Sequence, residues 1–243
     1  MQVLIVGDIH GNLEAFQSVL EDARKAGGVG EVWCLGDTVG YGPDPGPCLE
    51  LLQGPGHCTV AGNHDRAAVG LLDLDAFNPA AAEACRWTAQ QLTAAQRGFL
   101  RELPLVTRTG DFTLVHGSLQ DPVWEYLLTE EAALATFQRL ETRYCLVSHS
   151  HLPFLCRRQG EGAWFERLTV GSAVSLGDGP IILNPGSVGQ PRDGDPRAAY
   201  VLCDPEAGTA ELRRVPYAIE KTQEKMARAG LPSWLIARLS VGR

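Results

Sequence analysis

Histidine is scarce in this chain, and its positions follow a pattern. Five of the six histidines lie in short polar stretches that close apolar runs: they are His10, His64, His116, His149 and His151. Asp8, Asp37 and Asn63 lie in the same stretches. His57 lies outside them and is interpreted as an ordinary surface or strand-entry residue. Imidazole suits first-row transition metals, and carboxylates and amides add oxygen ligands. The set predicts a site for two divalent ions, and the absence of cysteine from it disfavours a thiolate zinc site.

The apolar runs in front of these polar stretches read as buried strands. Short runs rich in Val, Ile, Leu and Thr and closed by turn residues are typical of such strands. They cover residues 2–7, 31–35, 57–61, 112–115, 144–147 and 181–183. Ligands of open α/β sheets bind outside the carboxyl ends of the strands, where loops turn side chains into one pocket. Six such endings in one chain therefore indicate a shared site.

Helical patterns fill the intervals between the strands. Asn12 predicts the N-cap of a first helix. Residues 66–107 predict a mostly helical insert, with Asn78-Pro79 as one helix start and a capping box at Thr93-Ala94-Ala95-Gln96. No repeat or clear linker divides the chain, so we expect a single domain over residues 1–243. Further strands are expected at 164–170, 198–203 and 209–215, and further helices at 129–141, 219–229 and 232–239.

The composition narrows the class of protein. With 44% hydrophobic and 21% charged residues, the chain is an ordinary globular protein. No run is long and apolar enough to span a bilayer, and no signal-peptide pattern is present, so we expect a cytoplasmic protein without a membrane partner. The seven cysteines are odd in number and form no C-x-x-C pair, which predicts free thiols.

The charge balance bears on the substrate. The net charge of −8 and the lack of basic runs argue against stable nucleic-acid binding. At a metal site the local charge would have the opposite sign. Two carboxylates and two divalent ions leave a charge of about +2, which attracts phosphate. Two ions roughly 3.5–4 Å apart can also activate a bridging water for attack on phosphorus.

The motifs D-x-H, G-D, G-N-H-D, H-G and H-x-H, in this order from Asp8 to Pro191, resemble those of the calcineurin-like metallophosphoesterases. The stretch Asn184–Pro191 is similar to a small bacterial phosphodiesterase branch. Residues 41–45 and the insert are similar to bacterial proteins grouped with diadenosine tetraphosphatases and phosphoprotein phosphatases. The resemblance implies an α/β fold of α+β type, a four-layer sandwich of two mixed β-sheets flanked by helices. One position departs from the motif, because Ser148 stands where glycine is usual.

The resemblance also implies roles for individual residues. Asp8, His10 and His151 would bind a first metal, Asn63, His116 and His149 a second, with Asp37 bridging them. His64, beside Asn63, would act in catalysis by bonding a phosphoryl oxygen or by protonating the leaving group. Asp65 would orient His64, or else cap a helix. The cofactors would be two divalent ions holding a bridging hydroxide; manganese is favoured, and iron, zinc, nickel and cobalt also fit.

The implied function is metal-dependent hydrolysis of a phosphodiester, phosphomonoester or phosphoanhydride in a small, nucleotide-type substrate. Arg192, Tyr41 and Arg66 are the candidate substrate contacts, although surface ion pairs and packing explain such residues equally well. Trp124 and Tyr126 are candidates for stacking on a base. The alternatives are a catalytically silent scaffold or binding protein, a phosphoprotein phosphatase, and a nuclease, which the acidic charge disfavours. The oligomeric state stays open.

Overall fold

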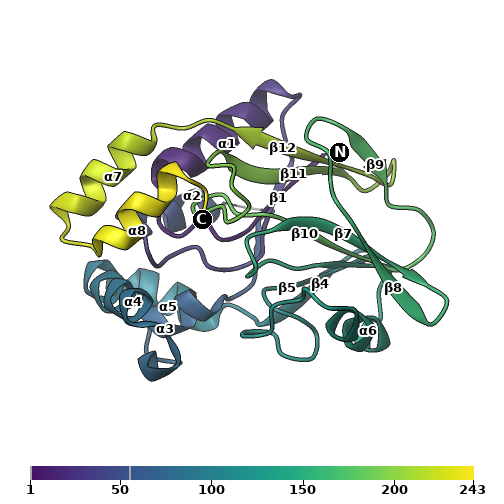
Figure 1. The fold of residues 1–243 in the computed structure, drawn as a ribbon, viewed down its shortest axis with the longest axis horizontal. Coiled ribbons are helices and arrows are strands. Elements are labelled where there is room, and N and C mark those ends of the chain that lie inside the picture. Colours follow the sequence, from purple (N-terminus) through teal and green to yellow (C-terminus); the bar gives the residue numbers. More distant parts are fainter. Residues whose placement is uncertain (1, 55) are drawn as a thin grey trace.

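The computed structural model describes residues 2–54 and 56–243, which form two six-stranded mixed sheets (Figure 1). The first sheet has the order β3 (Cys58–Thr59), β2 (Glu31–Cys34), β1 (Val3–Val6), β11 (Ala198–Asp204), β12 (Thr209–Val215) and β9 (Ala173–Ser175). The second has the order β4 (Val106–Thr109), β5 (Phe112–Val115), β6 (Tyr144–Leu146), β10 (Ile181–Pro185), β7 (Pro153–Gln159) and β8 (Gly162–Glu166).

Helices cover both outer faces of this pair of sheets. α1 (Leu13–Lys25) and α2 (Pro45–Leu52) pack on the first sheet, and α6 (Glu130–Arg139) packs on the second. The predicted four-layer sandwich is therefore confirmed. The remaining helices are α3 (Asn63–Ala68), η1 (Leu74–Ala76), α4 (Pro79–Gln91), α5 (Ala94–Glu102), α7 (Ile219–Arg228), α8 (Ser233–Ala237) and η2 (Arg238–Ser240). No helix in the described part of the chain is long and apolar enough to span a membrane.

The sequence of β1 shows why the strands appear as unbroken apolar runs. Val3 and Ile5 pack in the core between the two sheets, whereas Leu4 and Val6 pack against the helices of the outer face. Successive side chains of a strand point to opposite faces. Since both faces of this strand are covered, every position is apolar.

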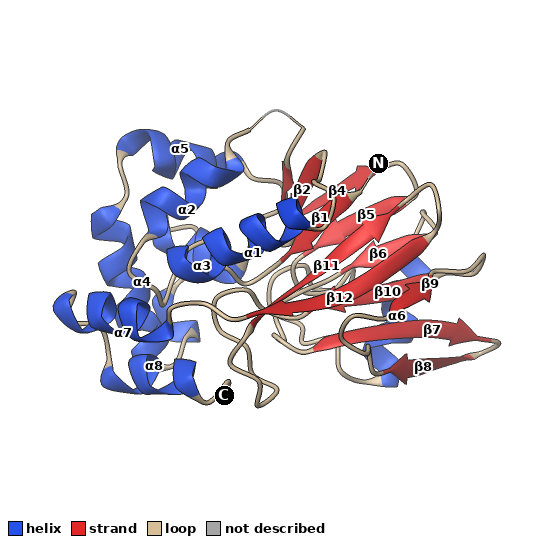
Figure 2. Ribbon diagram, turned by 90° about the horizontal axis from the view of Figure 1, so that it is seen from above, coloured by secondary structure: helices blue, strands red, loops and turns tan. Residues whose placement is uncertain are grey.

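Helices α3, α4, α5, α7 and α8 gather at one end of the sheets, as Figure 2 shows. α4 packs there against α7 and α8 through a cluster that includes Ala81, Met226 and Leu235. The predicted helix starts are confirmed. Asn78 accepts the N–H of Ala81, and Thr93 forms the capping box of α5.

Some predicted boundaries were wrong. Helix α5 ends at Glu102 and β4 begins at Val106, so the last residues of the expected 66–107 helical stretch form a strand. The strand expected at 164–170 instead spans Gly162–Glu166. The strand expected at 57–61 is limited to Cys58–Thr59.

Candidate metal centre

The seven predicted ligands converge at the carboxyl ends of the strands. Asp8, His10 and His151 form a first ligand cluster, in which Nε2 of His10 lies 3.3 Å from Nε2 of His151. Asn63, His116 and His149 form a second ligand cluster: Nε2 of His116 lies 3.1 Å from Oδ1 of Asn63 and 3.0 Å from Nδ1 of His149.

Asp37 lies between the two clusters. Its Oδ2 is 3.7 Å from Nε2 of His10 in the first cluster and 3.5 Å from Nε2 of His116 in the second. Its other oxygen, Oδ1, accepts the backbone N–H of His64 at 2.9 Å. This hydrogen bond fixes the carboxylate so that a single oxygen faces both clusters.

The outward nitrogens of the cluster histidines are bound by backbone carbonyls. Nδ1 of His10 donates to Val39 O at 3.2 Å, and Nδ1 of His116 donates to Leu35 O at 2.8 Å. Nδ1 of His151 donates to Gln190 O at 2.6 Å, and Nε2 of His149 donates to Trp124 O at 3.2 Å. A neutral imidazole that donates through one nitrogen keeps a lone pair on the other. The four inward nitrogens are thus acceptors facing one another, an arrangement that a cation stabilises.

Burial determines the charge state of these groups. It lowers the pKa of His116 to about 3 and that of His149 to about 2, and it holds the pKa values of His10 and His151 well below the ordinary value. The histidines are therefore neutral, which is the state in which imidazole can bind a metal ion.

The carboxylates shift in the opposite direction. Burial raises the pKa of Asp8 to about 7 and that of Asp37 well above its usual range. Oδ1 of Asp8 is buried and has no hydrogen-bond partner. An ionised, unpaired buried carboxylate is costly, and a bound cation removes that cost. The donor set therefore fits divalent metal ions.

The backbone at the centre is strained. Among the described residues, all the non-glycine residues with positive φ lie here: Asp8 (52°), His10 (50°), Asp37 (52°), Tyr41 (57°), His149 (63°) and His151 (61°). The surrounding chain holds this conformation through hydrogen bonds. The Asp8 carbonyl accepts from Gly189 N and from Ser187 Oγ, both at 2.9 Å, and His10 N donates to Asp37 O. Strain of this kind gathers at functional sites.

His64 borders the first cluster, and its ring centroid is 4.9 Å from that of His10. Its Nδ1 lies 3.2 Å from Sγ of Cys85 in α4. Asp65 does not orient the His64 ring, so that prediction was wrong. The Asp65 carboxylate accepts the backbone N–H groups of Gly62 and Val39, both at 3.0 Å, which is the helix-capping alternative.

A cavity of about 210 Å³ opens over the ligands and His64. Its walls include Tyr41, Phe77, Trp124, Tyr126 and Arg192. Tyr126 stacks on His149 with centroids 4.2 Å apart and is 48% exposed.

Two of the three candidate substrate contacts line this cavity. Arg192 lines the cavity and donates to Oε1 of Gln190 at 3.0 Å. Tyr41 lines it too, but is mostly buried against the rings of His10 and His64. Arg66 is absent from the lining, so its expected substrate contact finds no support. Phe77 and Cys85, which touch His64, were not foreseen from the sequence, since only the packing of η1 and α4 brings them there.

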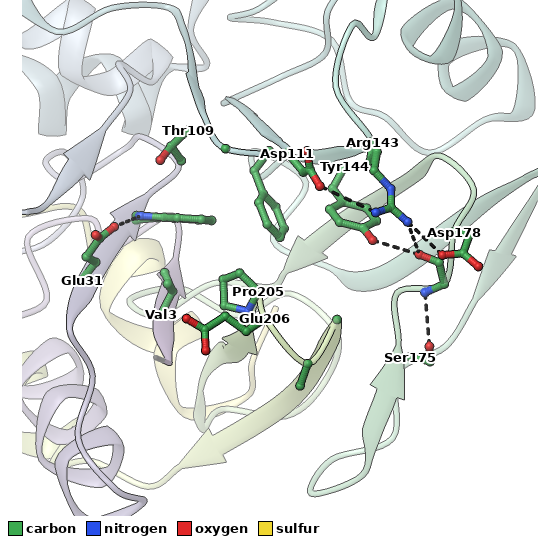
Figure 3. A pocket seen from close by; sticks show the side chains of 16 residues that line it. Val3, Glu31, Thr109, Asp111, Arg143, Tyr144, Ser175, Asp178, Pro205 and Glu206 are labelled. Carbon is green, nitrogen blue, oxygen red and sulfur yellow. Dashed lines mark hydrogen bonds and ion pairs between the residues drawn. The ribbon is translucent and has the colours of Figure 1, made fainter.

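A larger cavity of about 710 Å³ lies at the opposite end of the sheets (Figure 3). Val3 at the start of β1 and Asp111 in the β4–β5 turn line it, whereas the metal centre follows the far ends of these strands. Arg143 makes ion pairs there with Asp111 and Asp178, at 3.7 and 3.1 Å. The lining includes none of the predicted ligands, so this cavity is separate from the metal centre.

Residues 1–208 match the calcineurin-like phosphoesterase superfamily domain, and the chain therefore belongs to that superfamily. A solved metallophosphoesterase from Sphaerobacter thermophilus is 42% identical, with a TM-score of 0.90, and the match covers 100% of this chain and 99% of that one. An uncharacterized protein of Methanocaldococcus jannaschii is 36% identical over 99% of this chain and 98% of its own length.

A symmetrical bis(5'-nucleosyl)-tetraphosphatase of Nitrosococcus oceani is 30% identical over 141 residues. That match covers 55% of this chain and 49% of the relative, so the chain spans about half the length of this enzyme.

Proposed function

We propose that this protein is a binuclear metal-dependent phosphoesterase that hydrolyses small, nucleotide-type phosphate esters or anhydrides. The position of Asp37 carries the proposal, because one carboxylate oxygen lies within 3.7 Å of a histidine nitrogen in each ligand cluster. Asp8, His10 and His151 would hold one ion, and Asn63, His116 and His149 the other. Manganese is the favoured metal. When bound, two such ions lower the pKa of coordinated water and neutralise charge developing on phosphorus.

The side chains around the ligands support phosphate as the reacting group. Arg192 is the cationic side chain of the cavity lining, and its Nε is buried without a hydrogen-bond partner. A phosphoryl oxygen would satisfy that donor and pair with the guanidinium charge. His64 faces the same cavity and would donate either a hydrogen bond to a phosphoryl oxygen or a proton to the leaving group.

Aromatic walls favour a substrate that carries a base. Tyr126 is half exposed, and Phe77 and Trp124 pack edge to face with centroids 5.0 Å apart at the same cavity. Aromatic rings gain about 0.5–1.5 kcal/mol from stacking beyond their buried area. A nucleotide would thus place its phosphate over the metals and its base against these rings.

The test is turnover of the manganese-loaded protein on bis-p-nitrophenyl phosphate, p-nitrophenyl phosphate and a panel of nucleotides that includes diadenosine tetraphosphate. We expect metal-dependent hydrolysis that Asp37→Asn abolishes and His64→Ala lowers about 10²- to 10⁴-fold. His57→Ala is the matched control, since this histidine lies outside the site and accepts the Val32 N–H. No turnover with any of the five candidate metals would refute the proposal.

The base-stacking part has its own test. Tyr126→Ala should raise KM about 2- to 10-fold for nucleotides and leave it unchanged for an alkyl phosphate of the same charge. Trp164→Ala is the control, because Trp164 is an exposed aromatic residue of β8 outside the cavity lining. An equal change in KM for both substrates would contradict a base-binding role.

A further inference from the structure

The ring of His64 has an unusual polar neighbour. Cys85 comes from α4, 21 positions further along the chain, and its Sγ lies 3.2 Å from Nδ1 of His64. The thiol is 1% exposed, and its sulfur is not in a disulfide. Carboxylates stabilise a protonated imidazole, whereas a buried thiol carries no charge with which to do so. Burial raises the pKa of the Cys85 thiol, so it keeps its proton and can act as a donor.

Two polar groups also lie near His64: the ring of His10, with its centroid 4.9 Å away, and the Asp37 carboxylate, which accepts the backbone N–H of His64. A ring nitrogen of His64 lies within 4.8 Å of both groups, but the hydrogen bond at Nδ1 is the one with Cys85. The other neighbours are walls rather than hydrogen-bond partners. Tyr41 packs against the ring with centroids 4.3 Å apart, and Phe77 meets it edge-on at 5.1 Å. Gly40 closes a third side, because a Cβ at that position would lie 2.6 Å from Nδ1. These walls fix the plane of the ring. They do not select which of its nitrogens carries the proton, and that selection falls to Cys85.

We propose that Cys85 is a positioning residue whose S–H donates to Nδ1 of His64, so that the ring presents a neutral Nε2–H to a non-leaving phosphoryl oxygen. An imidazole that accepts at Nδ1 carries its proton on Nε2. Nε2 is then the nitrogen available to the cavity that His64 lines. In this arrangement His64 donates a hydrogen bond and keeps its proton. The inference rests on the proposed phosphoesterase function and decides between the two roles open to His64.

Three variants separate the thiol's role from simple packing. Cys85→Ala removes the donor, and Cys85→Ser keeps one. Cys48→Ala is the matched control, because Cys48 is a buried helical cysteine of α2 that packs in the apolar core behind the first sheet. We expect Cys85→Ala to lower kcat about three- to tenfold, Cys85→Ser to restore most of it, and Cys48→Ala to leave it unchanged. Metal content should be the same in all of them.

A double-mutant cycle shows whether Cys85 acts through His64. If it does, Cys85→Ala has no further effect on kcat in a His64→Ala background, whereas a purely structural loss would persist there. A series of aryl phosphodiesters tests the neutral-donor role. The loss in His64→Ala should be the same for good and poor leaving groups. A loss that grows as the leaving group worsens would overturn the inference in favour of proton donation.

A spectroscopic measurement keeps the inference testable even if every substrate fails. In zinc-loaded protein labelled with ¹⁵N-histidine, the His64 signals should show an unprotonated Nδ1 and a protonated Nε2. Cys85→Ser should keep this pattern, and Cys85→Ala should weaken it. A proton on Nδ1 in the unmodified protein would overturn the inference, whereas absent turnover with the expected spectrum would contradict only the proposed function.

Discussion

Replacing Ser148 by alanine should weaken metal binding at the first ligand cluster. Ser148 Oγ donates to Oδ2 of Asp8 at 2.5 Å, and this bond leaves Oδ1 buried and unpartnered, 3.6 Å from Nε2 of His151. Gly7 makes room for the hydroxyl, because a Cβ there would lie 2.1 Å from Ser148 Oγ. Ser148, which departs from the expected motif, therefore holds the carboxylate of a predicted ligand in place.

The strength of this hydrogen bond sets the size of the expected change in metal affinity. A hydrogen bond to a charged group contributes about 1.5–3 kcal/mol. Each 1.4 kcal/mol is roughly a tenfold change in an equilibrium constant. Without the hydroxyl, re-orienting and deprotonating Asp8 would cost free energy, and that cost would be subtracted from the free energy of metal binding. We therefore expect Kd to rise about 10- to 100-fold, the range typical of residues that support a metal ligand.

The assay is calorimetric titration of chelator-treated protein with manganese. Ser150→Ala is the control, since Ser150 is buried in the same loop and its hydroxyl accepts from Asn184 Nδ2 at 3.1 Å, whereas the hydrogen bond to the Asp8 carboxylate comes from Ser148. Ser148→Ala should weaken one of the two binding steps and leave kcat at saturating manganese close to the unmodified value. Unchanged affinity, or an equal loss in Ser150→Ala, would refute the reasoning.

Two further substitutions test the electrostatics and packing of the site. Asp8→Asn should raise the Tm of metal-free protein by several degrees above pH 7. Burial raises the pKa of Asp8 to about 7, so its ionisation in the folded state costs stability as the pH rises towards that value. The gain should vanish below about pH 4, where the acid is protonated in both states, and a lower Tm at pH 8 would contradict this. Gly40→Ala should lower kcat at least about tenfold with metal content unchanged, because its Cβ would lie 2.6 Å from Nδ1 of His64. Gly70→Ala is the control, because its backbone has a similar conformation, with φ of 72°, but the new methyl would lie in open space. Kinetic assays of this variant should show no comparable loss of kcat.

The fold was predictable where local signals agree with tertiary structure. The strands β1, β2, β5, β6 and β10 are buried along most of their length, so each appears as a short apolar run. β7 was not predicted, because it begins at a proline and ends in Arg-Arg-Gln. β9 was not predicted either, since it is a short, largely exposed strand at the edge of its sheet. These two segments are strands because they pair with neighbouring strands, and no apolar pattern in their sequences predicts this.

The candidate site also has a part that was predictable from the sequence and a part that was not. Its ligand residues follow strands directly, so motif order was enough to predict that Asp8, Asp37 and His116 would meet. The environment of His64 depends on how α4 and η1 pack over the loops, and a sequence alone does not give that packing. Cys85 was therefore predicted only as one of seven free thiols. For Asp65 the sequence left two roles open, orienting His64 and capping a helix, and the hydrogen bonds from the backbone N–H groups of Gly62 and Val39 to its carboxylate favour capping.

The strained backbone links the stability of the fold to the proposed chemistry. Five of the predicted ligands have φ between 50° and 63°, a conformation that costs about 1–3 kcal/mol for each non-glycine residue. Summed, this is about 5–15 kcal/mol, the size of the whole stability of a typical domain. The four-layer core must compensate for it, and bound metal ions would offset part of the cost by pairing with the buried carboxylates and the inward lone pairs. Saturating manganese should therefore raise the Tm markedly, by an amount that Asp37→Asn removes; equal melting temperatures with and without metal would show that the strain serves some other purpose.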